Sequence, residues 1–307
     1  MSRRFTWCAL LLLLGLASRG WLLADDARES KEKLRVLIID GQNNHDWRAM
    51  TPFMKKLFEK SGRFTVDVST NVRKGDKLPE GWMSVPFPPD LEKYDVLVSN
   101  YNGASWPDKL NKQLEERLET GKIGLVIIHA ANNSFGGWKE YNRMIGMGWR
   151  DKNYGDRLLL DESGKAVRIP KGQGDSTGHR DTRPFQVVVR DGDHPVTKGM
   201  PREWLHARDE LYDNLRGPIE NVHVLATAYS KGTKVHEPMI FTVSFGKGRV
   251  FHTPMGHSMG GDITALRCVG FITTMLRGTE WAATGKVTLP VPENFPGPDK
   301  ASSVPTK

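Results

Sequence analysis

The first 130 residues alternate apolar runs with segments of helical character, and this alternation leaves few folds open to the chain. We expect the apolar runs to form buried strands at residues 34–40, 64–70, 94–100 and 124–129. Between them, Thr51-Pro52 and Pro107 are favourable helix starts, and Gly62 and Gly121 are favourable helix ends. This order predicts an α/β fold with a mostly parallel sheet and helices on both faces.

The second half of the chain has a less regular pattern. Residues 136–183 are rich in Gly, Asp and Arg and contain a predicted hairpin at 157–170. Further strands are predicted at 185–191, 222–230 and 238–254, with a turn at 246–248 inside the last, and a packing helix at 263–278. We expect one domain over residues 34–286. Residues 287–307 are Pro-rich and predict an extended or disordered tail with no role in the chemistry.

The N-terminal 24 residues have the pattern of a secretory signal peptide. Arg3 and Arg4 precede an apolar stretch of 11 residues at 7–17, which is shorter than the roughly 20 residues needed to span a bilayer. Cleavage after Ala24 leaves Cys268 as the remaining cysteine, so an internal disulfide is not expected. Export without disulfides favours a bacterial periplasm or exterior, with no membrane span after cleavage. An uncleaved anchor is the alternative.

Charge and motif content exclude some partners and cofactors. The formal net charge of +8 falls to +5 when the signal peptide and its three arginines are removed (8 − 3 = 5). This charge is mild and is not concentrated in a Lys/Arg block, so nucleic acid is not an expected partner. The first strand is not followed by the GxGxxG glycines of a nicotinamide site. Local His or Cys spacing does not signal zinc, and no cofactor is predicted. A divalent metal held by distant histidines is left open, as is an oligomer.

Several histidines follow the predicted strands, and they are the main functional signal. His45 follows the first strand, His129 ends the fourth, and His257 follows the last. Ligands of open parallel sheets bind outside the carboxyl ends of the strands, so these side chains should converge. Imidazole titrates near neutral pH and binds metals. For each residue the alternative is structural: a satisfied core histidine for His129, and a polar loop residue for His45.

Other residues complete the expected site. The adjacent Asp209 and Glu210 cannot point the same way on a strand, so one should face the cleft while the other anchors the loop. We expect His129 and His257, with Asp209 or Glu210, to be catalytic through acid–base chemistry. A solvated acidic loop is the alternative. His179 is favoured slightly as a site residue over a loop residue, whereas the His194 turn is predicted to be structural.

The order of several motifs resembles one protein family. HPVTKGMPREWLHARDELYDN (194–214) and PMIFTVSFGKGRVFHTPMGHS (238–258), preceded by GLVIIHAANNSF and GHRDTRPF, are similar to the ThuA-like, trehalose-utilisation family over residues 34–275. The resemblance implies a flavodoxin-like three-layer α/β fold, similar to class I glutamine amidotransferases but without their catalytic cysteine. It also implies a link to disaccharides and oxidised, keto sugars. The polar residues that it implies are His45, His129, His179, Asp209, Glu210, Tyr212 and His257.

The leading hypothesis is an exported carbohydrate-utilisation enzyme, an isomerase, lyase or hydrolase acting on a disaccharide or keto-sugar derivative. His45, His179, Tyr212 and Trp47 would bind the small sugar substrate. A glutaminase is not expected, because Cys268 falls in a packing helix and that chemistry needs a thiolate. One alternative is a non-catalytic sugar-binding module, with loop tryptophans stacking on sugar faces; these are Trp47, Trp82, Trp106, Trp138 and Trp149. The other is a metal-dependent hydrolase.

Overall fold

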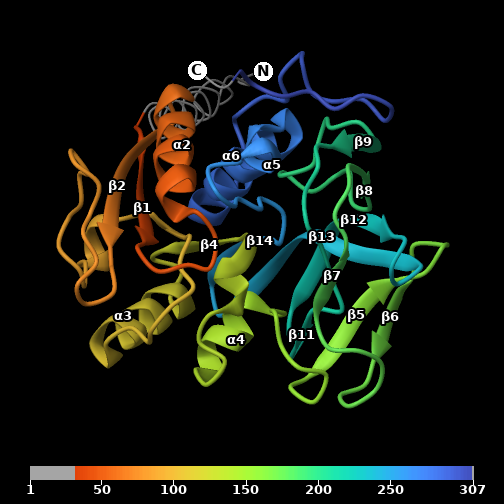
Figure 1. Cartoon of the computed structure of the whole chain (residues 1–307), viewed down its shortest axis with the longest axis horizontal. Helices are drawn as coiled ribbons and strands as arrows, with labels where there is room; N and C mark the ends of the chain where they lie inside the picture. The colour runs from red at the N-terminus through yellow and green to blue at the C-terminus, as the bar shows by residue number, and fades with distance from the viewer. Residues whose placement is uncertain (1–31, 306–307) are drawn as a thin grey trace, which may run out of the picture. The chain divides into compact units, whose positions relative to one another are not determined.

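The parallel half of the molecule is built as the sequence predicts. The computed structural model describes residues 32–305, so the expected signal peptide lies outside the described residues. Five strands run parallel in the order β2-β1-β3-β4-β14 (Figure 1). Their bounds are β1 Leu34–Asp40, β2 Phe64–Thr70, β3 Val96–Ser99, β4 Gly124–Ile128 and β14 Gly248–Thr253. The centre of this sheet is buried on both faces, which explains the unbroken apolar runs.

Helices cover both faces of the parallel half and make three layers. Successive residues of a strand point to opposite faces. Val36 and Ile38 therefore pack with helices α2 (Trp47–Lys60) and α6 (Val269–Thr284) in one core cluster. Leu37 and Ile39 pack in a second cluster with α3 (Asp108–Glu119) and α4 (Lys139–Ile145). Figure 1 shows the two helix layers on either side of the sheet.

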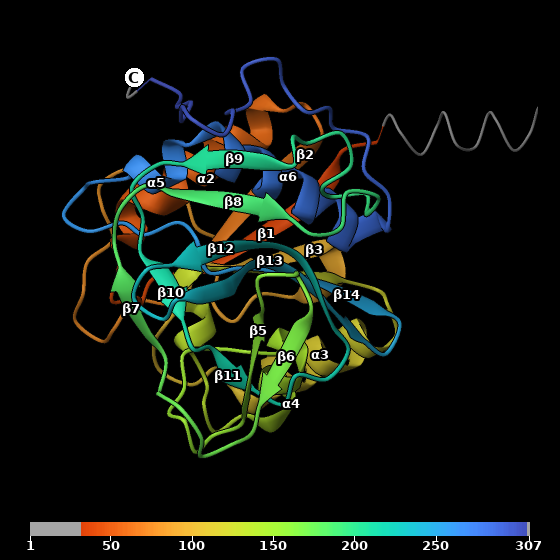
Figure 2. The ribbon, with the colours of Figure 1, turned by 90° about the vertical axis from the view of Figure 1, so that its right-hand side faces the viewer.

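The expectation of a mostly parallel sheet holds for one half only. The hairpin turn after β13 (Val235–Phe245) reverses the chain, and from β14 onward the order β14-β13-β12-β8-β9 is antiparallel. These strands are β8 Phe185–Val189, β9 Glu203–His206 and β12 Val222–Ser230. The predicted hairpin is β5 (Asp156–Leu160) and β6 (Ala166–Ile169), which joins the same sheet with β11 (Arg216–Gly217). Figure 2 faces this mixed region.

Two helix boundaries differ from the prediction. Helix α2 begins at Trp47 and not at Thr51, because Asp46 caps it by accepting the Ala49 amide, and Pro52 lies inside it. The predicted helix 263–278 is two helices, α5 (Thr264–Arg267) and α6, separated by Cys268, whose backbone is extended. Helix α6 continues to Thr284, where left-handed Gly285 ends it.

The Pro-rich tail runs along the domain without a helix. Leu289, Phe295 and Val304 pack against the first core cluster, and the Val269 amide donates to the carbonyl of Ser302. The tail is therefore extended and packed through residue 305. Among the described residues, the helices are all too short or too polar to cross a membrane.

Candidate active site

Three histidines meet where the parallel strands end. His45 lies in the loop after β1, His129 directly follows β4 at the start of a short 3₁₀ segment (His129–Asn133), and His257 lies in the loop after β14. The ring centroid of His45 is 4.4 Å from that of His129 and 4.9 Å from that of His257. The carboxyl ends of parallel strands share one edge, and this brings together residues more than 200 positions apart.

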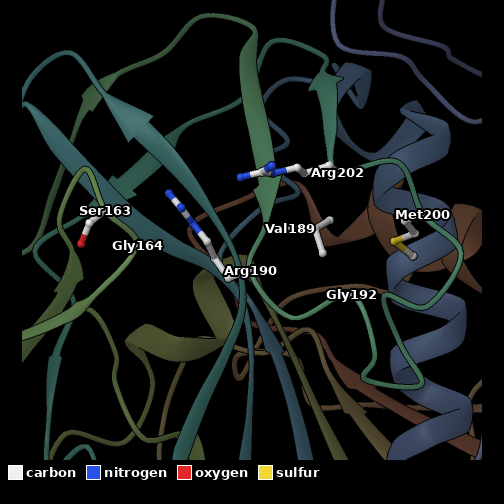
Figure 3. Close-up of a pocket in the computed structure, with 7 residues that line it drawn as sticks. All are labelled: Ser163, Gly164, Val189, Arg190, Gly192, Met200 and Arg202. Atoms are coloured by element: carbon white, nitrogen blue, oxygen red, sulfur yellow. The ribbon is translucent and has the colours of Figure 1, made fainter.

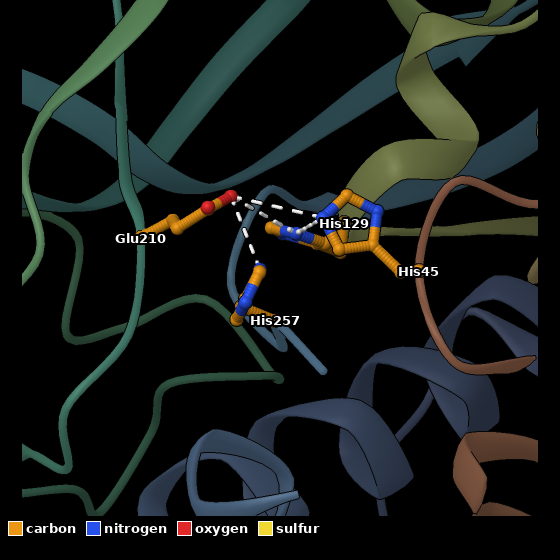
Figure 4. Close-up of side chains that lie close together, drawn as sticks. All are labelled: His45, His129, Glu210 and His257. Atoms are coloured by element: carbon orange, nitrogen blue, oxygen red, sulfur yellow. Dashed lines mark hydrogen bonds and ion pairs between the residues drawn. The ribbon is translucent and has the colours of Figure 1, made fainter. Parts of the chain in front are cut away.

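Glu210 completes the group from the other half of the molecule. It lies between β9 and β10 (Leu211–Asp213). Its Oε2 atom is 3.2 Å from His257 Nδ1, 3.6 Å from His129 Nε2 and 3.8 Å from His45 Nε2. We call these four residues the histidine–glutamate centre. Figure 4 shows the four side chains directed toward one another.

The His129 imidazole is held in one tautomer. Its Nδ1 lies 2.7 Å from the carbonyl oxygen of Pro254, which can only accept, so Nδ1 carries the proton. Burial lowers the pKa of His129 to about 3, with a smaller effect from His45, so the ring is neutral at neutral pH. Its Nε2 lone pair therefore points into the centre. The backbone of His129 is left-handed, with φ of 47°, a conformation that non-glycine residues rarely adopt.

On the accessible side of the centre, the Glu210 carboxylate lies beside the His257 imidazole. Burial alone would raise the pKa of Glu210, but the neighbouring His257 and His45 imidazoles outweigh it and hold that pKa well below its usual range. The Glu210 carboxylate, 3.2 Å from His257 Nδ1, in turn raises the pKa of His257. At neutral pH the pair offers a carboxylate and an imidazole with an increased tendency to hold a proton.

Tyr212 and His179 lie next to the centre. The Tyr212 hydroxyl is 3.2 Å from His129 Nε2, and its ring packs on Trp149. Burial raises the pKa of Tyr212 well above 10, so it is a neutral hydroxyl. His179, on β7 (Gly178–Asp181), has its Nε2 3.7 Å from Glu210 Oε1, and its side chain is 43% exposed. It therefore lies at the rim.

The four residues of the centre could also hold a metal ion. One ligand atom from each lies within 4.8 Å of every other, and they are the one such group among residues 32–305. The set consists of three imidazole nitrogens and one carboxylate, which are common ligands of transition metals.

Comparison with known proteins identifies the family. The family model described as ThuA, trehalose utilisation, matches residues 35–282. The chain belongs to the ThuA family. A crystal structure of a ThuA-like protein from Parabacteroides merdae is similar to this chain at 39% identity, with a TM-score of 0.81, covering 89% of this chain and 98% of that one. The search of curated proteins found no match.

Two more distant structures bear on the fold. A ThuA-like protein from Bacteroides uniformis has 18% identity and a TM-score of 0.52 over 83% of this chain and 93% of that one, which shows a shared fold. The glutaminase domain of Trypanosoma brucei CTPS with bound acivicin has 8% identity and a TM-score of 0.38 over 84% and 97% of the two chains. That likeness is too weak to support an argument.

Asp209 and Glu210, two adjacent residues that the family resemblance implies for the site, have different surroundings. The Asp209 side chain is fully buried, and its oxygens accept the amides of Gly256 and His257 at 2.7 and 3.0 Å and the Nε2–H of His206 at 2.8 Å. Glu210 reaches into the centre instead. Asp209 thus anchors the His257 loop, and of the two adjacent carboxylates Glu210 is the one placed for chemistry.

His206 is a residue that the sequence interpretation did not single out. It is fully buried on β9, beside Asp209 and the Cys268 thiol. Burial opposes its protonation, but Cys268 and Asp209 outweigh burial and raise the pKa of His206 to about 9. The spacing His206-x-x-Asp209 was the available signal. Cys268 is buried behind this pair, outside the histidine–glutamate centre.

The tryptophans are mostly packing residues. Trp47 and Trp106 are each 3% exposed, and Trp47 packs edge-on against Trp82. The structure therefore does not bring the Trp47 ring to the centre, where it was expected to bind substrate. Trp149 is the tryptophan that contacts the site, through Tyr212 and His179.

The centre opens on one side into a cavity of about 250 Å³. Glu210 and His257 form part of its wall, and the remaining lining residues are Thr182, Arg208, Asp209, Met259, Asp262, Thr264 and Ala265. A larger cavity of about 480 Å³ lies near the β5–β6 turn and contains Arg190 and Arg202 (Figure 3). The wall of that cavity has no residue of the centre and no acid–base pair.

Proposed function

We propose that this ThuA-family protein is an exported carbohydrate-processing enzyme and that the histidine–glutamate centre is its active site. The observation that supports this most is the convergence of three imidazoles and one carboxylate beside a cavity. Family membership supports a role in carbohydrate utilisation. A cavity of about 250 Å³ next to Glu210 and His257 has room for one sugar ring more readily than for a polymer.

We propose proton transfer on an oxidised sugar as the reaction. A carbonyl on a sugar ring acidifies the neighbouring C–H, so isomerisation or elimination needs a positioned proton acceptor and a proton donor. The ionised Glu210 and the His257 imidazole, 3.2 Å apart, supply such a pair on the accessible side. A nucleophile is not required. Cys268 is buried behind His206, which argues against thiolate chemistry.

The deciding experiment compares turnover on keto disaccharides and on their unoxidised parents. Glu210→Gln keeps the size of the side chain and removes its charge. It should lower kcat by about 10²–10⁴-fold on the keto substrates. Glu293→Gln, at an exposed position in the tail, is the matched control and should retain wild-type turnover. Equal turnover by both variants would remove the centre from the reaction.

The non-catalytic sugar-binding module receives less support. Its stacking surface was expected from loop tryptophans, and two of these, Trp47 and Trp106, are buried. Binding of keto sugars to wild-type protein, measured by calorimetry, with no product formed on any of them, would favour the module over the enzyme.

Export is a separate part of the proposal, because it depends on residues 1–24. N-terminal sequencing of the protein recovered from its host should find a chain that begins at Asp25. A mature chain that still begins at Met1 would support the uncleaved anchor.

A further inference from the structure

We propose that His45, His129, Glu210 and His257 bind one divalent transition-metal ion. This goes beyond the proposed function, because with an ion bound Glu210 and His257 are its ligands and no longer a free proton acceptor and donor. The choice of substrate rests on the proposed function, but the binding of the ion does not. The argument depends on the distances between donor atoms, on the tautomer of His129 and on the burial of the imidazoles.

The distances between donor atoms fit the edges of a coordination polyhedron. A tetrahedral zinc ion with Zn–N distances of 2.0–2.1 Å separates its ligand atoms by about 3.3–3.4 Å. Here His45 Nε2 is 3.2 Å from His129 Nε2, and Glu210 Oε2 is 3.2 Å from His257 Nδ1. The two Glu210 distances to His129 and His45 are 3.6 and 3.8 Å. All four donor atoms lie within 4.8 Å of one another, so side-chain rotation is needed to bring the more distant pairs around one ion.

His129 has the hydrogen bond that is typical of a metal-ligating histidine. Metal-bound imidazoles usually donate their other N–H to a carboxylate or a backbone carbonyl, which fixes the ring. The Pro254 carbonyl accepts from Nδ1 at 2.7 Å, so the Nε2 lone pair faces the other donors. The left-handed backbone of His129 sets this direction at the end of β4. Its strain is consistent with a functional constraint.

The space around His129 Nε2 is crowded with polar atoms. His45 Nε2 and the Tyr212 hydroxyl are each 3.2 Å away, and Glu210 Oε2 is at 3.6 Å. A neutral imidazole nitrogen has one lone pair, which these three atoms cannot all share well. Both imidazoles are almost inaccessible to water, so solvent does not satisfy them. A cation between His129, His45 and Glu210 would satisfy the donors together.

The ligand types favour a borderline transition metal. Imidazole suits Zn²⁺, Fe²⁺, Co²⁺, Ni²⁺ and Cu²⁺, whereas Mg²⁺ and Ca²⁺ prefer oxygen ligands. Cys268 lies behind His206 and does not add a thiolate to the set. The cavity beside Glu210 and His257 leaves room for a further ligand on the accessible side. A sugar carbonyl oxygen bound there would be polarised, which suits the proposed keto-sugar substrate.

The test uses a chain of residues 25–307 without a histidine tag. The protein is stripped of metal with a chelator and dialysed. Zn²⁺, Co²⁺ and Mg²⁺ are added separately, and bound metal is measured by elemental analysis and calorimetry. We expect one Zn²⁺ or Co²⁺ per chain and no comparable binding of Mg²⁺. Co²⁺ should give the visible absorption of a nitrogen- and oxygen-ligated ion.

Variants assign the ion to the centre. Glu210→Gln and His45→Ala should weaken Zn²⁺ binding by more than the roughly 10–100-fold typical of losing an outer-shell partner. His223→Ala is the control, because its side chain is 55% exposed and pairs with Asp191 outside the centre. Circular dichroism confirms that each variant is folded. Wild-type protein without a bound ion, or variants that bind like the control, would overturn the proposal.

Failure of the metal proposal can be told apart from failure of the proposed function. Stoichiometric Zn²⁺ binding at the centre without turnover of any keto sugar would contradict the enzyme and leave the metal site standing. Turnover of keto sugars by protein that binds neither Zn²⁺ nor Co²⁺ when these are added would contradict the metal site and leave the enzyme standing.

Discussion

At the scale of single residues, the adjacent Asp209 and Glu210 have different roles at the site. Glu210 presents its carboxylate to three imidazoles, whereas Asp209 uses its own carboxylate to hold two amides of the next loop and the His206 ring. Both residues were candidates from the sequence, because the DELY run shows two carboxylates and no direction for either. Only the folded backbone decides which one faces the cleft.

Replacing Asp209 should mainly affect stability. Asp209→Asn removes the carboxylate that pairs with the buried His206 ring at 2.8 Å, and breaking a buried pair in this way costs about 3–5 kcal/mol. Urea denaturation measures the free energy of unfolding. Asp299→Asn, at an exposed site, should change it by less than about 0.5 kcal/mol. Similar losses in the two variants would show that the His206 pair is not stabilising.

Asp40 should give the unfolding free energy a pH dependence in the acidic range. It is fully buried at the end of β1, and burial raises its pKa from 3.8 to about 6, with Thr51, Thr70 and Arg48 offsetting only part of this. The folded state thus holds a proton that the unfolded state releases. The associated stability is complete below pH 3.8 and is lost as pH rises through about 6.

Asp40→Asn tests this assignment. The variant should be more stable than wild type at pH 7, by up to about 3 kcal/mol, with the difference shrinking toward pH 4. Chemical denaturation at a series of pH values gives both curves. A variant that is less stable than wild type at pH 7 would show that the Asp40 charge is well compensated.

At the scale of elements, the sequence predicts the parallel strands and misses the mixed sheet. Apolar runs such as residues 34–40 are a local signal, because a strand buried on both faces needs apolar residues throughout. Strand direction depends on partners far along the chain and has no such signal. The sequence predicts a later start for α2 because Thr51-Pro52 also fits a helix start, whereas the residue that caps the helix is Asp46.

The sequence predicts the part of the candidate site that follows from where the parallel strands end. His45, His129 and His257 follow parallel strands, so the fold rule of a shared carboxyl edge brings them together. The role of Trp47 depended on its being in a loop, and it lies buried on α2 instead. For His206 the sequence offers only its spacing of three residues from Asp209, because its significance arises from burial beside Asp209 and Cys268.

Helix α6 contains a glycine that packing requires. Alanine normally favours a helix over glycine by about 1 kcal/mol. A Cβ at Gly270 would overlap the buried Trp204 ring of β9, so Gly270→Ala should instead destabilise the protein by about 1–3 kcal/mol. Thermal unfolding measures the change. Gly137→Ala, which meets nothing within 4 Å, is the control and should have little effect.

At the scale of the whole molecule, the C-terminal tail is part of the fold. The amides of Thr288 and Leu289 donate to the fully buried carboxylate of Glu280, and Leu289 and Phe295 cover the first core cluster. These contacts lie beyond residue 286, where the sequence predicted the domain to end. The tail therefore contributes to the stability of the domain.

Removing the tail should lower stability measurably. A chain that ends at Lys286 loses the two hydrogen bonds from backbone amides to Glu280 and exposes part of the apolar core. Its Tm should therefore fall by on the order of 10 °C. A chain that ends at Pro305 keeps all of these contacts and should melt like the full-length protein. Calorimetry compares the two. Equal melting temperatures would mean that the packed tail is energetically neutral.

The origin of the four converging side chains has a mechanical consequence. Three imidazoles follow strands of the parallel half, whereas the carboxylate arrives from beyond β9, in the antiparallel half. A metal ion bound by all four side chains would link the parallel and antiparallel halves of the sheet and restrict their movement relative to each other. Amide hydrogen exchange in β9 and β10 should then slow when an ion binds, even though Glu210, between these two strands, supplies only one of the four contacts.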